Sequence, residues 1–170
     1  EINVPLLVGE GSTDAAAQGN AEKFHQSTFA LYEINLYTRI CTICQPLSIL
    51  QWQLTSDYSL LWGDGIYGSK GPLRPTQRFW NIKQLASTPA DALAIPVSSS
   101  KKNVNCAAFG NMVRGEYAVH MVNNGADCEA VISGIPAEVK KLKVYVTNTK
   151  DCMKETAVKV ENGLVRVHLP

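Results

Sequence analysis

The spacing of apolar residues changes near Pro89, and this change limits the folds open to the chain. Before it, two apolar runs, residues 2–8 and 48–55, alternate with two segments of helical periodicity, residues 15–44 and 77–87. The order strand, helix, strand, helix is typical of parallel strands joined by crossover helices. After it, apolar residues recur in short segments, several with a period of two. We therefore predict an α+β chain of two parts, divided at this proline.

The first predicted helix is bounded by residues that begin and end helices. Asp14 can accept hydrogen bonds from the free amides of a first turn, and Pro46 stops the helix just past its end. In the second helix, Thr76 is the predicted cap. The predicted buried face of the first helix follows three- and four-residue steps. It consists of Phe24, Leu31, Ile34, Tyr37, Cys41 and Cys44.

The second part is predicted to be all β. Asn124-Gly125 and Asn162-Gly163 lie between predicted strands, and this dipeptide is typical of hairpin turns because both residues tolerate positive φ. Short strands at roughly ten-residue spacing favour an antiparallel β-sandwich. The predicted domains are residues 1–89 and residues 90–170. The strands are expected at residues 104–109, 116–123, 128–133, 142–146, 157–160 and 164–169.

Composition excludes several classes of function. The formal net charge is +1, from 16 Lys and Arg against 15 Asp and Glu, which argues against nucleic acid as the main partner. No run of about 18 apolar residues exists, so we predict no membrane span. The cysteine count of five is low and odd, which argues against a disulfide framework. The Cys41–Cys44 motif has no second pair of ligands and the three histidines are scattered, so we predict no metal and no cofactor.

One carboxylate has the position of a functional group. Glu10 follows an apolar run and lies between Gly9 and Gly11, which let the backbone turn and leave the side chain accessible. In parallel α/β architectures, functional residues gather at the C-terminal ends of the strands. The competing interpretation is an ordinary loop or capping acid ahead of a helix, and spacing alone gives the two equal weight.

Aromatic and polar residues gather at the corresponding end of the next strand. An indole packs against the apolar C–H face of a sugar ring, while amide and carboxylate groups can hydrogen-bond sugar hydroxyls. For Trp52 in this run, core packing is the competing interpretation, and on the sequence position alone it is favoured about two to one. The candidate saccharide-binding residues are Gln51, Trp52, Asp57, Tyr58 and Trp62.

These segments resemble the end of a TIM-barrel glycoside hydrolase of the retaining superfamily called clan A. The resemblance is to enzymes of the glucosylceramidase and xylanase type, and residues 5–11, 50–54 and 73–85 carry it. It implies that the first part is the last two β/α units of the barrel and the second a β-sandwich accessory domain. It also implies that Glu10 is the catalytic nucleophile and that Trp52 forms the floor of the sugar subsite.

The resemblance further implies that the chain is one portion of an enzyme. The general acid/base of the clan is a Glu after the fourth barrel strand, and the chain has no such segment, so alone it is expected to be inactive. Its first residue, Glu1, and its last, Pro170, suggest a C-terminal fragment or a processed product. Unpaired strand edges predict self-association or a complementing barrel fragment. A secreted or periplasmic location follows from the resemblance alone.

The alternative function is a non-catalytic carbohydrate-binding or structural β-sandwich module. Such modules bind sugars through exposed aromatic side chains. The second part has only Phe109, Tyr117 and Tyr145, all within or at the ends of predicted strands, which counts against this alternative.

Overall fold

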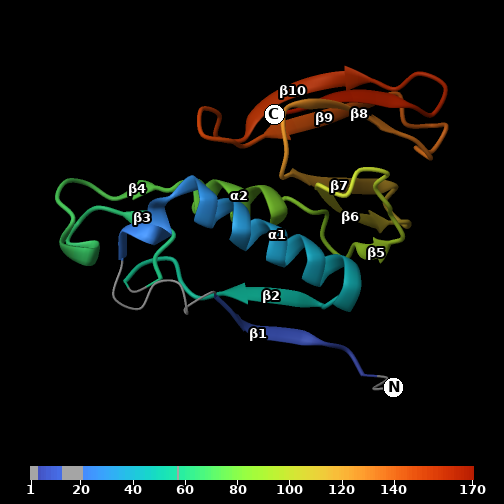
Figure 1. The fold of residues 1–170 in the computed structure, drawn as a ribbon. Helices are drawn as coiled ribbons and strands as arrows, with labels where there is room; N and C mark the ends of the chain where they lie inside the picture. The colour runs from blue at the N-terminus through green and yellow to red at the C-terminus, as the bar shows by residue number, and fades with distance from the viewer. Residues whose placement is uncertain (1–3, 13–20, 57) are drawn as a thin grey trace.

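The computed structural model describes residues 4–12, 21–56 and 58–170. Two helices occupy the middle of the molecule, with a parallel pair of strands on one side and two layers of antiparallel strands on the other (Figure 1). Within the described part of the chain, neither helix has both the length and the apolar character needed to cross a bilayer. The thiols of all five cysteines are free.

The parallel pair consists of β1 (Leu7–Gly11) and β2 (Ser48–Gln51), joined through helix α1 (Ser27–Cys44). The predicted order of strand, helix and parallel strand is therefore observed. Strand β1 lies further along the chain than the predicted run, because pairing with β2 continues through Gly11. A Cβ atom at Gly11 would lie 2.9 Å from the hydroxyl of Tyr37, so glycine is needed where β1 meets α1.

The long predicted helix is interrupted. A 3-10 helix, η2 (Ala21–His25), precedes α1, and between them Gln26 is extended with φ −76° and ψ 138°. Phe24 and Phe29 on either side of the break pack edge-on, with ring centroids 5.1 Å apart. The predicted cap, Asp14, lies outside the described residues. The predicted C-terminal end is confirmed, because α1 ends at Cys44.

The buried face of α1 differs from the predicted one. Tyr37 and Cys41 are buried as predicted, whereas Leu31 and Cys44 are exposed. The prediction used only apolar residues, and it missed Glu33, which is 1% exposed. The buried residues of α1 are Phe29, Ala30, Glu33, Tyr37, Thr38 and Cys41.

Helix α2 (Gln77–Leu85) begins where the sequence predicts, and Thr76 Oγ1 accepts a hydrogen bond from the amide of Phe79 at 3.4 Å. The segment between β2 and α2 contains a small antiparallel hairpin of β3 (Leu61–Trp62) and β4 (Arg74–Pro75), with the 3-10 turn η3 (Ile66–Gly68) between them. Two-residue strands carry no alternation, so the sequence predicted only a loop here.

The second part of the chain forms two layers of antiparallel strands. One layer has the order β5-β6-β7, with β6 at its centre. In the other layer β8 pairs with β11 and β9 pairs with β10. Buried Val104 of the first layer packs with Val165, Val167 and Leu169 of the second, so the core lies between the layers. The strands are β5 (Leu93–Ile95), β6 (Val104–Asn111), β7 (Glu116–Asn123), β8 (Cys128–Ile132), β9 (Lys141–Val146), β10 (Lys154–Lys159) and β11 (Val165–Leu169).

Two details of this part depart from the sequence analysis. Strand β5 was not predicted, because three residues are too short to show a period. The predicted hairpin at Asn124-Gly125 is wrong: the turn leads from β7 in one layer to β8 in the other. By contrast, Asn162-Gly163 makes the expected tight turn, with φ values of 52° and 72° and a bridge between Glu161 and Leu164.

Candidate functional site

Glu10 and Trp52 come from neighbouring parallel strands at the same end of the pair. Gly11 of β1 pairs with Gln51 of β2, and the amide of Trp52 donates a 2.8 Å hydrogen bond to the carbonyl of Gly11. This is the arrangement on which the predicted sugar site depends. It follows from the strand–helix–strand order, because a helical crossover returns the chain in the same direction.

The strand register is irregular at Glu10, and the side chain of this residue reaches solvent. Val8 pairs with Ile49 and Gly11 pairs with Gln51, so β1 has one more residue than β2 over this stretch. Ile49 and Gln51 both lie on the side of the pair that faces Tyr37 of α1. Glu10 lies within this irregularity and is exposed. The side chain of Trp52 is 46% exposed. The acid and the indole are therefore both accessible to solvent at this end of the pair.

Gln51 supports the backbone at this end of β2. The hydroxyl of Tyr37 donates to Gln51 Oε1, and Gln51 Nε2 donates to the carbonyl of Trp52 at 2.8 Å. Burial raises the pKa of Tyr37, so its hydroxyl stays protonated and able to donate. The structure thus uses both ends of the Gln51 amide to tie Trp52 to α1.

The loop after β2 folds back on itself. The amides of Leu60 and Leu61 donate to the carbonyls of Gln53 and Leu54 at 3.1 and 3.2 Å. The hydroxyl of Ser59 also donates to the carbonyl of Leu54, at 2.9 Å. The peptide bond that leads into this loop, Trp52–Gln53, is cis. Asp57, a candidate ligand in the same loop, lies outside the described residues.

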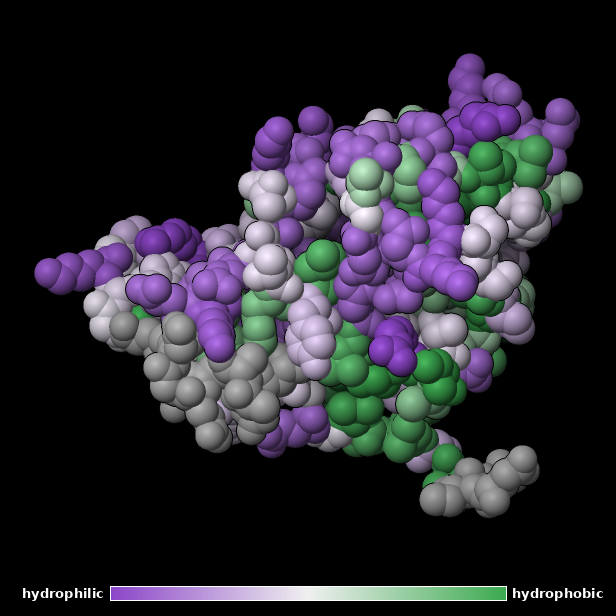
Figure 2. Space-filling model, viewed as in Figure 1, coloured by the Kyte–Doolittle hydropathy of each residue, from purple (hydrophilic) through white to green (hydrophobic). Residues whose placement is uncertain are grey.

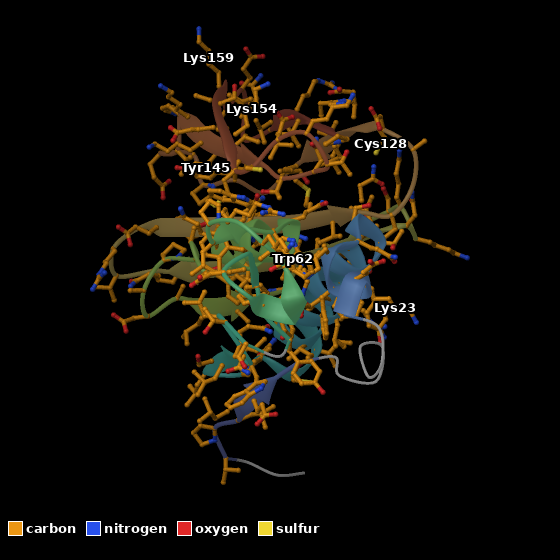
Figure 3. All side chains as sticks on the ribbon, turned by 90° about the vertical axis from the view of Figure 1, so that its left-hand side faces the viewer. Lys23, Trp62, Cys128, Tyr145, Lys154 and Lys159 are labelled. Carbon is orange, nitrogen blue, oxygen red and sulfur yellow. The ribbon has the colours of Figure 1, made fainter. Side chains whose placement is uncertain are left out.

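The other two aromatic candidates pack against neighbouring rings. Tyr58 is half-buried, and its ring meets Phe24 edge-on at 5.3 Å between centroids. Trp62 is also half-buried, with its ring centroid 3.7 Å from that of His25. Figure 3 looks onto this side of the molecule, where Trp62 lies near the centre and Lys23 toward the right. Trp52 is therefore the more exposed of the described aromatic candidates.

A buried ion pair behind this loop was missed by the sequence analysis. Arg78 of α2 donates from Nε and Nη2 to the two carboxylate oxygens of Glu33 on α1, at 2.9 and 2.7 Å. Nη1 of Arg78 donates to the carbonyls of Tyr58 and Ser59, at 3.2 and 3.0 Å. The available signal was the four-residue spacing Phe29, Glu33, Tyr37, which puts an acid on the buried face.

Two histidines are held neutral by the fold. Burial, followed by the charges of Arg78 and Arg74, lowers the pKa of His25 to about 4. Burial also lowers the pKa of His120 to about 4, and Nε2 of this ring lies 2.8 Å from Thr88 Oγ1. Both values are below the 6.5 expected of an exposed imidazole.

These pKa values predict a loss of stability in mild acid. Between pH 6.5 and 4 the histidines of the unfolded chain bind protons that those of the folded chain do not. The free energy of unfolding is therefore highest above pH 6.5 and falls as the pH drops toward 4. The urea midpoint is expected to drop between pH 7 and pH 5. The drop should be smaller in the double variant His25→Gln/His120→Gln, and an equal drop in both proteins would contradict the assignment.

A cavity of about 330 Å³ lies elsewhere in the structure, between α1 and the segment leading into β6. Arg39, Lys101 and Lys102 line it, and none of its lining residues belongs to β1, β2 or the loop after β2. Across the described ranges, no three His, Cys, Asp or Glu side chains are placed to hold a metal ion.

The comparisons with known proteins show the fold. No family model and no curated protein matches the sequence. The structure is similar to the crystal structure of a GH30 endoxylanase from Clostridium papyrosolvens C71, with a TM-score of 0.76 and 14% sequence identity. The similarity covers 98% of this chain and 39% of that enzyme. The chain thus has the fold of about two fifths of the endoxylanase.

Proposed function

We propose that the chain is the C-terminal part of a retaining glycoside hydrolase that cleaves O-glycosidic bonds of a polysaccharide or oligosaccharide. The observation that carries this proposal is the placement of Glu10 and Trp52 at the same end of two adjacent parallel strands, in a fold shared with part of an endoxylanase. On this proposal residues 1–89 are the last two β/α units of a TIM barrel and residues 90–170 are a β-sandwich.

In the proposed reaction Glu10 is the nucleophile. Its carboxylate attacks the anomeric carbon and forms a glycosyl-enzyme, while a second carboxyl group about 5–5.5 Å away protonates the leaving oxygen. Water then releases the sugar, with that second group acting as the base. The second carboxyl would come from a part of the enzyme that this chain does not span. The chain alone is therefore expected to bind sugar but to hydrolyse little.

Trp52 is the proposed platform for the sugar ring. Its indole is exposed, and Leu50 and Leu54, two residues before and after it in the chain, are 52% and 54% exposed, so apolar side chains are available for the C–H face of a pyranose. Asp57, Tyr58 and Trp62 are proposed to contribute to the same subsite, and Gln51 to hold the platform in place. Because the similar structure is an endoxylanase, xylan is the first polysaccharide to test.

Replacing the platform should weaken saccharide binding without unfolding the chain. Trp52→Ala is expected to lower the affinity for xylohexaose at least about five-fold, since ring stacking is worth roughly 1 kcal/mol beyond area burial. Trp52→Phe retains an aromatic face and should lose less. Titration calorimetry measures the affinity, and circular dichroism checks that both variants are folded. Equal affinity of Trp52→Ala and the unaltered chain would contradict the platform.

We call the face of the parallel pair that is turned away from α1 its open face. In the intact enzyme, this face is proposed to be covered by further strand–helix units. Parallel sheets are normally buried on both faces, yet Leu7 and Leu50 are 55% and 52% exposed. Apolar side chains also gather on the adjoining side of the molecule, over β2 and the end of α1 (Figure 2), where Ile43 and Leu47 are 70% and 73% exposed. This surface can take a complementing barrel fragment or a second copy of the chain.

We therefore expect the isolated chain to self-associate. Sedimentation velocity at micromolar concentration should show dimers or larger species, and Leu50→Lys should shift the population toward monomer because it places a charge on the open face. A monodisperse monomer of the unaltered chain would contradict this expectation.

The non-catalytic alternative lacks a supporting surface. Phe109, Tyr117 and Tyr145 are the only aromatic residues after residue 90, and none of their side chains is fully exposed. Phe109 packs against His120 at 5.9 Å between ring centroids. A secreted or periplasmic location remains part of the proposal, because a polysaccharide substrate lies outside the cell.

A further inference from the structure

We propose that Arg78, oriented by Glu33, is a positioning residue for the loop that begins at Trp52, and that this ion pair sets the affinity of the saccharide subsite. The statement about affinity rests on the proposed function. The statement about the loop rests on the hydrogen bonds alone and can be tested separately.

The first step is the geometry of the pair. Arg78 is 0% exposed and Glu33 is 1% exposed, and their two parallel hydrogen bonds join α2 to α1. The rings of Phe24 and Phe29 cover the guanidinium, with centroids 4.8 and 5.3 Å from Cζ. Bidentate pairing fixes the plane of the guanidinium as well as its distance. The direction of Nη1, the nitrogen that does not bind Glu33, is therefore fixed as well.

That direction is the loop. Nη1 bridges the carbonyls of Tyr58 and Ser59, and Tyr58 has a φ of 62°, which is unfavourable for a residue with a bulky side chain. Ser59 is 0% exposed, so water could not replace the hydrogen bond from Arg78 to its carbonyl if Arg78 were changed. The charged donor thus holds two successive peptide groups in a conformation that the chain would not otherwise favour.

From there the restraint reaches Trp52 through backbone bonds. Leu60 and Leu61 follow the clamped residues and donate to Gln53 and Leu54, the two residues that follow Trp52. On its other side the amide of Trp52 is bound to Gly11. The backbone of Trp52 is therefore held on one side by β1 and on the other by a loop that Arg78 binds at its far end.

The choice of residues favours positioning over stability. A buried ion pair is often no more stabilising than apolar side chains of similar volume. Lysine would keep the charge, but its ammonium lacks the planar guanidinium that binds the Glu33 carboxylate and the loop carbonyls at the same time. Only arginine can satisfy both partners from one fixed plane.

The loop is tested by amide hydrogen exchange in Arg78→Lys. The matched control is Val167→Ala, which weakens the core between the β layers, with urea added so that both variants have equal global stability. Exchange at Leu60 and Leu61 is expected to be at least ten-fold faster in Arg78→Lys than in the control, while the Val122 amide in β7 exchanges equally. Equal exchange at Leu60 and Leu61 in both variants would overturn the proposal.

The affinity is tested with xylohexaose by titration calorimetry on the same proteins. Arg78→Lys is expected to bind about ten-fold more weakly than the control, and equal binding would overturn the second half of the proposal. If the unaltered chain gives no heat with xylohexaose, the proposed function fails, and the exchange result still decides the role of Arg78 in the loop. Should Arg78→Lys not fold, Glu33→Leu/Arg78→Met takes its place, because apolar replacement of a buried pair preserves folding.

Discussion

On the proposed function, Glu10→Gln in the intact protein is expected to lower kcat on xylan at least about a thousand-fold. Glutamine has nearly the same shape as glutamate, but its neutral amide cannot form the glycosyl-enzyme, and loss of a catalytic nucleophile costs rates of this order or more. Because Glu10 is exposed, the substitution should leave the fold intact. Release of reducing ends from xylan measures the rate.

The matched control for this variant is Glu138→Gln, which removes an exposed carboxylate between β8 and β9. It should retain the activity of the unaltered enzyme. Wild-type activity in Glu10→Gln would refute the nucleophile assignment, whatever the remaining similarity to endoxylanases.

The second large effect concerns stability. Glu33→Ala and Arg78→Met, taken singly, are each expected to lower the free energy of unfolding by about 3–5 kcal/mol, because each leaves the other charge buried without its partner. The double variant Glu33→Leu/Arg78→Met should recover much of that loss, since neither charge remains. Urea unfolding followed by circular dichroism gives the three values.

The comparison pair for these variants is Lys143 and Glu155, which are 3.2 Å apart but 66% and 52% exposed. Removing either member should change stability little, because solvent screens exposed pairs. A single substitution at Glu33 or Arg78 that costs no more than one at Lys143 would contradict the role given to burial.

Features set by neighbouring residues could be predicted from the sequence. The cap at Thr76 depends on residues within one turn of α2, and the alternation in β11 leaves Val165, Val167 and Leu169 buried with Arg166 and His168 exposed. The adjacency of β1 and β2 was also predicted, because a strand, a helix and a strand in that order leave few arrangements.

Features set by distant contacts could not be predicted. Glu33 pairs with Arg78, which is 45 residues away. The spacing of Phe29, Glu33 and Tyr37 indicates a buried acid on α1, but it does not show which residue pairs with that acid. The turn at Asn124 has the local chemistry of a hairpin, but the strands on its two sides find partners in different layers. The side chain of Tyr58 turns toward Phe24, which an inspection of the loop sequence does not reveal.

Covalent trapping tests the role of Glu10 most directly. The intact enzyme is incubated with a 2-deoxy-2-fluoro-xylobioside that carries a good leaving group, which slows release of the glycosyl-enzyme, and its peptides are then analysed by mass spectrometry. We predict a mass increase of one fluoroxylobiosyl unit on the peptide containing Glu10, at the carboxylate of that residue. A label on a different carboxylate, or steady turnover of the reagent with Glu10 never modified, would contradict the assignment.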